Sequence, residues 1–304
     1  MALRLMLPHD DLTAHLGQRG AVSVPDRVID LAGPGAIGCL QGIFTNEVEK
    51  VATPSLLWGA LLTPKGMIIS DLWVIRRDDT AQLIVPAEGY DAVRALLARS
   101  FPPRLAKITP RDDLAVAWLT GTPPAELAEV EIIPPPTMAP FTALAIGPAT
   151  ALMPALATAG FPAHPAEYAD ALKLLAGWPT LGREIDDRTL VQEVRFDELD
   201  GVRYDKGCYV GQETVARLHF RGHPNRTLRG LRGDGAAPTE LTVVAGADQR
   251  EVGTVTTIGT LPDGWLGLAK IRREVETGSE VAVGGQRAMV VEVGGRSQNV
   301  KGET

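Results

Sequence analysis

The most informative stretch of the chain reads Lys206-Gly207-Cys208-Tyr209-Val210-Gly211-Gln212-Glu213. Glycines before and after Cys208 permit unusual backbone angles and close approach by a partner molecule. Lys206, two residues before the thiol, favours the thiolate, which is the nucleophilic and metal-binding form of cysteine. Cys208 and Lys206 are therefore the candidate reactive pair. A small buried cysteine in a glycine-rich turn is the structural alternative.

Upstream of this stretch the chain alternates between strand-like and helix-like patterns. Alternating apolar residues predict strands at 28–32, 56–62, 67–75 and 83–85. Apolar residues at helical spacing, together with glycine and proline stops, predict helices at 36–41, 90–100 and 168–175. Thr63-Pro64-Lys65-Gly66 is a turn signal, so the second and third strands form a hairpin. Residues 121–140 contain six prolines and predict a connector or a meandering edge.

The character of the chain changes after residue 228. Short strands separated by glycine turns are predicted at 241–244, 253–258, 266–269, 280–283 and 288–293. Regularly spaced short strands of this kind indicate a small antiparallel barrel or sandwich. The sequence therefore predicts an α+β body followed by an all-β tail.

Composition narrows the class of protein. The 304 residues are 45% hydrophobic and 22% charged, as in ordinary globular proteins. The net charge of −7 argues against a bulk electrostatic DNA or RNA binder, although a local basic strip still allows contact with RNA. No run approaches the ~18–20 apolar residues that a membrane span needs. Only two cysteines, Cys39 and Cys208, are present and far apart, so we expect a reducing cytoplasm.

A glycine pattern near the N-terminus invites a nucleotide-binding interpretation that the rest of the sequence does not support. Gly33-Pro34-Gly35-Ala36-Ile37-Gly38 follows a predicted strand, as a dinucleotide-binding turn does. The helix after it is short, because Gly42 and Thr45-Asn46 interrupt it. The acidic residue that should end the next parallel strand is also missing. We interpret the pattern as a plain strand-to-helix turn and expect no NAD binding.

The motif around Cys208 resembles the signature of the YgfZ family, which is similar to the folate-binding T-protein of glycine cleavage. Further stretches carry the resemblance, which covers about residues 25–120 and 165–295. They are Leu40-Gln41-Gly42-Ile43-Phe44-Thr45-Asn46-Glu47-Val48, Thr63-Pro64-Lys65-Gly66 with Asp71, Gly177-Trp178-Pro179, Ala216-Arg217 with Arg221-Gly222, Val252-Gly253-Thr254-Val255 and Leu266-Gly267-Leu268-Ala269. The resemblance implies an α+β, GcvT-like three-lobed folate-binding fold with a small C-terminal antiparallel β-barrel. Residues 1–222 would form the aminomethyltransferase-like region of two interleaved α+β lobes, and 223–304 the barrel.

The resemblance also implies a cofactor, tetrahydrofolate, held in a central channel. Glu193 occupies the position of the carboxylate that would accept N–H donors from the pterin edge. The other cofactor-binding candidates are Asp71, Gln212, Arg217 and Arg221. The two arginines belong to a run without acidic residues from Thr214 to Gly233, suited to glutamyl carboxylates. The same run is also compatible with a barrel fringe or with a docking surface for RNA or a protein. We expect the pterin slot and Cys208 to share one cavity.

The sequence differs from the transferases at two positions that affect the expected reaction and ligand contacts. The transferases carry adjacent aspartates in the hairpin strand, whereas this chain has Ser70-Asp71, which makes one-carbon transfer doubtful. The helix before Gly177 has Lys173 where relatives often have arginine, which keeps the charge and loses the bidentate fork.

Two functional hypotheses follow from the resemblance. The preferred one is a folate-bound accessory factor that supports assembly or repair of iron–sulfur clusters and, through them, tRNA modification. Its partners would be folate, iron–sulfur proteins or assembly factors, and indirectly tRNA-modifying enzymes. Two cysteines cannot ligate a cluster alone, so Cys208 would be a transient ligand or redox thiol. The alternative is a folate-dependent aminomethyltransferase or demethylase, favoured by Asp71 and Glu193.

Overall fold

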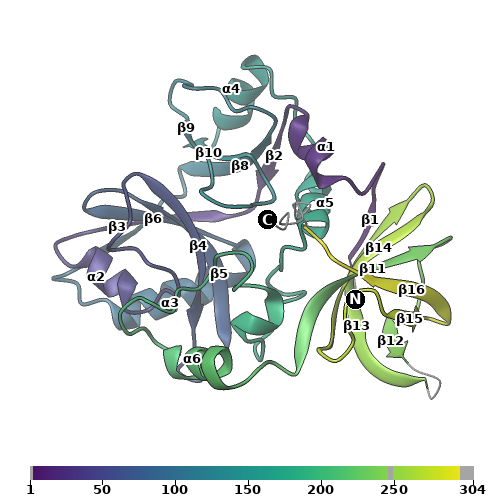
Figure 1. Ribbon diagram of the computed structural model, residues 1–304. Coiled ribbons are helices and arrows are strands. Elements are labelled where there is room, and N and C mark those ends of the chain that lie inside the picture. Colours follow the sequence, from purple (N-terminus) through teal and green to yellow (C-terminus); the bar gives the residue numbers. More distant parts are fainter. Residues whose placement is uncertain (1–2, 246–248, 295–304) are drawn as a thin grey trace, which may run out of the picture.

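The computed structural model describes residues 3–245 and 249–294, and it arranges their strands in three sheets. A five-stranded and a four-stranded sheet form the body, and six further strands close a barrel beside it (Figure 1). The helices of the described part are α1 (Leu12–Gly17), α2 (Ala36–Gln41), α3 (Tyr90–Ser100), α4 (Leu152–Thr158), α5 (Glu167–Ala176) and α6 (Gln212–Arg221), with 3-10 helices η1 (Ala87–Gly89) and η2 (Val191–Val194). None of them is long and apolar enough to cross a membrane.

The five-stranded sheet has the order β4-β5-β6-β3-β7. Its strands are β3 (Arg27–Ala32), β4 (Ser55–Leu62), β5 (Ile68–Arg76), β6 (Thr80–Val85) and β7 (Lys107–Pro110). Successive side chains point to opposite faces of a strand. In β5, Leu72 and Val74 therefore pack in the core that also holds residues of α2 and α3, whereas Trp73 and Ile75 pack in a second, central core. Asp71 lies two residues before Trp73, so its side chain points to the same face of β5, toward the central core.

The four-stranded sheet completes the body. Its order is β2-β8-β10-β9, from β2 (Gly20–Val24), β8 (Leu114–Thr120), β9 (Glu131–Ile133) and β10 (Ala143–Pro148). Both faces of this sheet are apolar. One face packs in a core with α4, and the other packs in the central core, where Trp118 lies. The central core also holds Trp58, Trp178 and Phe196, with ring centroids of Trp58 and Phe196 4.0 Å apart.

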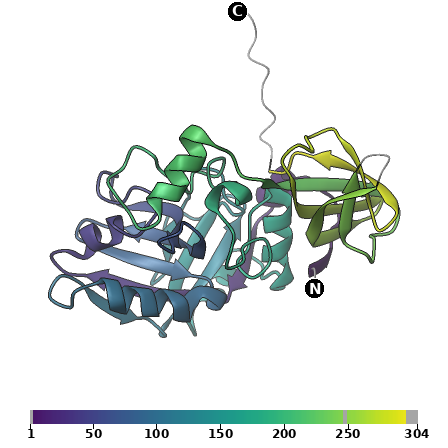
Figure 2. The ribbon, with the colours of Figure 1, turned by 90° about the horizontal axis from the view of Figure 1, so that it is seen from below.

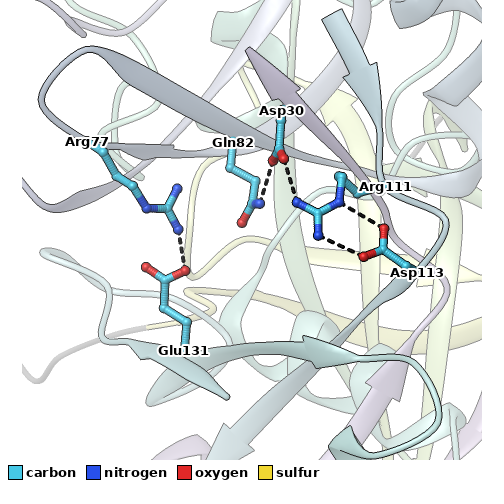
Figure 3. Close-up of polar contacts among 6 residues, drawn as sticks. All are labelled: Asp30, Arg77, Gln82, Arg111, Asp113 and Glu131. Atoms are coloured by element: carbon cyan, nitrogen blue, oxygen red, sulfur yellow. Dashed lines mark hydrogen bonds and ion pairs between the residues drawn. The ribbon is translucent and has the colours of Figure 1, made fainter. Parts of the chain in front are cut away.

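Polar side chains join the two sheets of the body (Figure 3). Arg111 donates to Asp30 of β3 at 2.7 Å and to both carboxylate oxygens of Asp113 at 2.8 and 2.7 Å. Gln82 of β6 donates to Asp30 at 2.6 Å, and Arg77 forms an ion pair with Glu131 of β9. The bonds to Asp113 and Asp30 raise the pKa of Arg111, and the bonds from Arg111 lower the pKa of Asp113. Each charged side chain of this cluster has at least one partner of opposite charge, so we interpret the cluster as a structural seam.

The barrel closes in the order β11-β14-β13-β12-β15-β16 and back to β11. Its antiparallel strands are β11 (Arg226–Asp234), β12 (Thr242–Ala245), β13 (Arg250–Leu261), β14 (Gly264–Arg272), β15 (Glu280–Val283) and β16 (Gln286–Val291). The strand β1 (Leu3–Met6) adds to β13 in parallel, with Leu3 opposite Thr257. Glu184, 1% exposed, bonds the barrel to the body by accepting from the hydroxyls of Thr256 and Thr257 at 2.6 and 2.7 Å.

Most predicted elements are confirmed. The helices at 36–41 and 90–100 have the predicted bounds, and the hairpin and five barrel strands lie within a few residues of theirs. The proline-rich stretch contains only the three-residue edge strand β9. The sequence patterns do not predict the four-stranded sheet or the helices α1 and α4. They also miss β11 and α6, because β11 carries arginines in place of clean alternation and α6 buries only Val215.

Candidate functional site

A cavity of about 590 Å³, here called the central cavity, is lined by residues of both sheets of the body and opens to the surface beside exposed residues such as Pro25 and Glu88. Its wall is contributed by the end of β2, by β5, η1 and β8, by α5, and by residues 180–183 after that helix. Segments that are far apart in the sequence thus meet around one space. The polar and aromatic side chains of its wall include Asp26, Asp71, Glu88, Trp118, Lys173 and Arg183.

Asp71 is the predicted site residue that this cavity contains. Its side chain is 7% exposed, and Trp58 Nε1 donates to its Oδ2 at 3.2 Å. Its Oδ1 is buried and has no hydrogen-bond partner. Burial raises the pKa of Asp71, and Lys173 and the Trp58 hydrogen bond oppose that rise. An unpaired buried carboxylate oxygen is costly unless a ligand or water donates to it.

A second carboxyl group, Asp26, lies in the same wall between β2 and β3. Burial raises its pKa to about 6, because Lys173 only partly offsets the desolvation and the negative charges of Asp71 and Glu88 add to the rise. Asp26 therefore holds its proton to a higher pH than an ordinary aspartate does.

Besides the two carboxyl groups, the wall of the cavity contains a cation, Lys173, and an aromatic side chain, Trp118. The Lys173 ammonium lies 5.3 Å from the centroid of the Trp118 ring, a cation–π distance. The indole Nε1 of Trp118 is buried without a partner, as is Asp71 Oδ1. The residues of the wall thus include acceptors, a cation and an aromatic side chain with an unpaired donor, a set suited to a flat, nitrogen-rich heterocycle.

The Lys-Gly-Cys stretch occupies a different part of the body. Lys206 is 7% exposed, and its Nζ donates to the backbone carbonyls of Gln41, Phe44 and Asn46 at 3.0, 2.6 and 2.6 Å. The amide of Val210 donates to the carbonyl of Gly42 at 3.0 Å. These bonds dock the stretch on residues 41–46. The proposed effect of Lys206 on the thiol of Cys208 stays a prediction.

Cys208 itself is exposed, in the loop that leads into α6. Gly211 caps α6 with φ 85°, and a Cβ there would lie 2.6 Å from the carbonyl oxygen of Thr63. The predicted turn 63–66 therefore packs directly against the start of α6. The structure joins three motifs that are distant in the sequence: residues 41–46, the hairpin turn and the loop of Cys208.

The remaining predicted site residues lie outside the wall of the cavity. Glu193 is half-buried in η2, and its Oε2 accepts from the amide of Leu190 at 3.0 Å. Gln212 opens α6, and Arg217 and Arg221 are exposed on that helix. Neither Cys208 nor Glu193 lines the cavity, so the expectation of one shared cavity is not met by this space. The roles of these residues remain predictions.

Sequence reasoning missed Asp26, Glu88 and Trp118. Asp26 follows a proline and directly precedes a strand, which is a weak signal for an acid held at a strand edge. Nothing in the sequence distinguishes Trp118 from a core tryptophan. Within the described residues, no group of three or more His, Cys, Asp or Glu side chains is placed to hold a metal ion.

Comparison with known proteins confirms the resemblance drawn from the motifs. No family model matches the chain. The chain is 27% identical over 286 residues to the tRNA-modifying protein YgfZ of Sodalis glossinidius (strain morsitans), covering 86% of this chain and 85% of the relative. It is 27% identical over 269 residues to that of Klebsiella pneumoniae (strain 342), covering 78% and 79%.

A solved structure shows the fold. The glycine cleavage system aminomethyltransferase T from Bartonella henselae superposes with a TM-score of 0.78, at 19% identity, over 95% of this chain and 90% of that one. The predicted fold class, α+β and GcvT-like with a C-terminal antiparallel barrel, is confirmed.

Proposed function

Because this chain is a relative of the YgfZ proteins with the fold of an aminomethyltransferase, we propose that it is a folate-binding accessory protein. In this proposal it supports assembly or repair of iron–sulfur clusters and, through them, tRNA modification. The relatives' name supports the link to tRNA modification, and the transferase fold supports folate. The observation that carries the folate proposal is the buried, unpartnered Oδ1 of Asp71 in the central cavity.

Tetrahydrofolate fits the residues of this cavity. A pterin is flat and carries ring-edge N–H groups, which Asp71 Oδ1 would accept, and the Trp118 ring offers an aromatic wall. The volume of about 590 Å³ lies within the usual range of ligand cavities, roughly 300–1,000 Å³. When bound, the folate would supply nitrogen atoms that can carry a one-carbon unit.

The charges of the protein groups around the cavity would decide which hydrogen-bond donors and acceptors a ligand meets. The Lys173 ammonium would stay near Asp71 and Asp26 and keep at least one of them ionised as an acceptor. The other carboxyl group, when protonated, becomes an O–H donor for a ring nitrogen or carbonyl. The apolar wall, including Leu181 and Ala169, would exclude water from these contacts.

Cys208 would act separately from the folate. Its exposed thiol can meet a partner protein or a cluster in transit, which a buried cysteine could not do. The docking of Lys206 on residues 41–46 would hold the loop in place. In this proposal Glu193, Gln212, Arg217 and Arg221 remain candidates for the folate by resemblance alone.

The second candidate is a folate-dependent aminomethyltransferase or demethylase. Asp71 in the cavity of a transferase fold favours it. Ser70, whose hydroxyl donates to the Asp71 carbonyl at 2.8 Å, stands where the transferases have a second aspartate and weighs against it. Incubation with tetrahydrofolate and a methylated amine separates the two, since only the enzyme would form methylene-tetrahydrofolate above a no-protein control.

Titration of the protein with tetrahydrofolate by calorimetry tests the folate proposal. We expect Asp71→Asn to weaken binding at least about tenfold, since one charge-assisted hydrogen bond contributes roughly 1.5–3 kcal/mol. The exposed Asp91→Asn is the matched control and should bind as the wild type does. Glu193→Ala should also weaken binding, and Cys208→Ala should leave it nearly intact. Undiminished binding by Asp71→Asn would remove the basis of the proposal.

The role of Cys208 needs a cellular measurement. In a strain lacking the gene, the wild-type protein should restore the activity of an iron–sulfur enzyme and Cys208→Ala should not. Cys39→Ala is the matched control, because Cys39 is the other free thiol and is partly buried in α2. Full restoration by Cys208→Ala would refute the thiol's role while leaving the folate site untouched.

A further inference from the structure

The C-terminal half of α6 exposes the rings of His219 and Phe220, and the half-buried ring of Tyr204 in the preceding loop adjoins them. Phe220 is 68% exposed. The rings of Tyr204 and His219 stack with centroids 3.6 Å apart and an interplanar angle of 17°. Phe220 meets both of them edge-on, at 5.9 and 4.7 Å. The rings thus form one continuous aromatic surface rather than isolated side chains, and α6 lies on the outside of the body (Figure 2).

Hydrogen bonds hold this aromatic surface in a fixed orientation. The Tyr204 hydroxyl donates to the carboxylate of Asp197 and accepts from Gln192 Nε2 at 3.3 Å. Gln192 in turn donates to the carbonyl of Val215 in α6 at 2.9 Å. The rings are therefore placed before any partner arrives, which lowers the entropy lost on binding.

Arginines adjoin the rings on α6, while the Asp197 carboxylate that accepts from Tyr204 also lies 4.0 Å from His219 Nδ1. Residues 217, 220 and 221 are spaced three and four apart on a helix, so Arg217, Phe220 and Arg221 share one face. Arg226 follows at the start of β11 and is also exposed. Among the described residues these three arginines have no ion pair or side-chain hydrogen bond. The sequence from Thr214 to Gly233 contains no acidic residue, although the whole chain has a net charge of −7.

Aromatic faces interleaved with free guanidinium groups match the chemistry of unpaired nucleotides. Bases stack on exposed rings, and arginines meet the phosphates between them. An acidic peptide would use the charges and leave the rings unexplained. An apolar partner would use Phe220 and leave the arginines desolvated without counter-charges.

We infer that Arg217, Phe220 and Arg221, with the stacked Tyr204 and His219, form a contact surface for an unpaired stretch of RNA. The inference deepens the proposed function, and its link to tRNA rests on that proposal. Cys208 lies three residues before the N-terminal cap of α6, a ten-residue helix about 15 Å long. Arg217 lies near the middle of this helix and Arg221 at its C-terminal end. RNA bound at the arginines would therefore lie within reach of the exposed thiol.

Fluorescence anisotropy of labelled RNA tests this surface. The probes are a short unstructured single strand, the blunt duplex of the same sequence and an unmodified tRNA transcript. We expect the single strand and the tRNA to bind more tightly than the duplex, because paired bases cannot stack on protein rings. Phe220→Ala should weaken single-strand binding about tenfold, and Phe220→Tyr should retain it.

The charge contribution has its own readout. Arg217→Ala combined with Arg221→Ala should reduce the slope of log K against log salt by about 1.4, since each phosphate contact to a single strand contributes about 0.7. Arg99→Ala combined with Arg104→Ala is the matched control, because it removes the same charge from exposed positions at and after the end of α3. That pair should keep both affinity and slope.

Failure of this inference can be distinguished from failure of the folate proposal. Phe220→Ala should bind tetrahydrofolate as the wild type does, and Asp71→Asn should bind RNA as the wild type does. The inference is overturned if wild-type protein binds no RNA, if the α6 variants bind as tightly as the control pair, or if the duplex binds best. A protein partner held by this surface in place of RNA would overturn it as well.

Discussion

The ammonium of Lys206 donates a 2.6 Å hydrogen bond to the carbonyl oxygen of Phe44, a residue 162 positions earlier in the chain. The carbonyls of Gln41 and Asn46 accept from the same nitrogen. One side chain therefore satisfies three backbone acceptors at the turn after α2. The lysine of the Lys-Gly-Cys stretch holds two distant motifs together, whatever it does for the neighbouring thiol.

Replacement of this lysine should destabilise the fold. Lys206→Met leaves three buried carbonyls without a donor, and we expect the free energy of unfolding to fall by about 2–4 kcal/mol. Urea denaturation measures the change, with the exposed Lys65→Met as control. A variant as stable as that control would show that water replaces the ammonium without loss.

The cavity carboxyl group Asp26 should make stability depend on pH. Its pKa of about 6 in the folded protein lies above the 3.8 of an ordinary aspartate, so the folded state holds the proton more tightly. This contribution to stability is present below about pH 4 and is lost as pH rises through 6. Asp26→Asn removes it, so the variant should gain roughly 1–2 kcal/mol relative to wild type between pH 4 and pH 7, reduced by the partial exposure of Asp26.

Denaturation at a series of pH values checks this expectation. Asp112→Asn is the control, since Asp112 is exposed and its ion pair with Arg27 is open to solvent. A stability difference between wild type and Asp26→Asn that does not change with pH would contradict the assignment.

The contact between the hairpin turn and α6 depends on a glycine. Gly211→Ala places a Cβ at a position with φ 85° and within 2.6 Å of the Thr63 carbonyl, and we expect a loss of about 1–3 kcal/mol. Gly207→Ala is the control, because a Cβ there meets no atom within 4 Å. Thermal unfolding of the two variants should therefore differ, with Gly211→Ala melting at the lower temperature. Equal melting temperatures would mean that the turn moves aside.

The two thiols should differ in reactivity. Iodoacetamide should modify Cys208 first in the folded protein, since Cys208 is exposed and Cys39 is partly buried against the core of the five-stranded sheet. Mass spectrometry of peptides after a short exposure gives the order. Unfolding in urea should make the two rates similar, and faster labelling of Cys39 before unfolding would contradict the structure.

The sequence allowed much of the fold to be predicted and less of the site. Strand alternation and turn chemistry are local properties, so the hairpin around Thr63-Pro64-Lys65-Gly66 and most barrel strands could be predicted. Asp26, Asp71 and Lys173 meet only because three distant segments fold around one space. Their neighbourhood, and the burial that raises the pKa of Asp26, cannot be seen in any local pattern.

The docking of Lys206 shows the same limit. Its spacing from Cys208 indicated a chemical role, yet its three hydrogen-bond partners are carbonyls 160 or more residues away. Backbone carbonyls occur at every residue and give no sequence signal. Motif resemblance marked the right segments, 41–46 and 206–213, without showing that they touch.

The pairing of β1 with β13 constrains the order in which the molecule can be completed. A ribosome releases residues 3–6 about 250 residues before their partner strand, so these residues wait for nearly the whole of synthesis without a sheet to join. Because the contact joins residues about 250 positions apart, closing its loop costs more entropy than a local contact does, and β1 can pair only after β13 has been made. A nascent chain stalled before β13 would therefore expose an unpaired leading strand, which a chaperone or a protease can recognise.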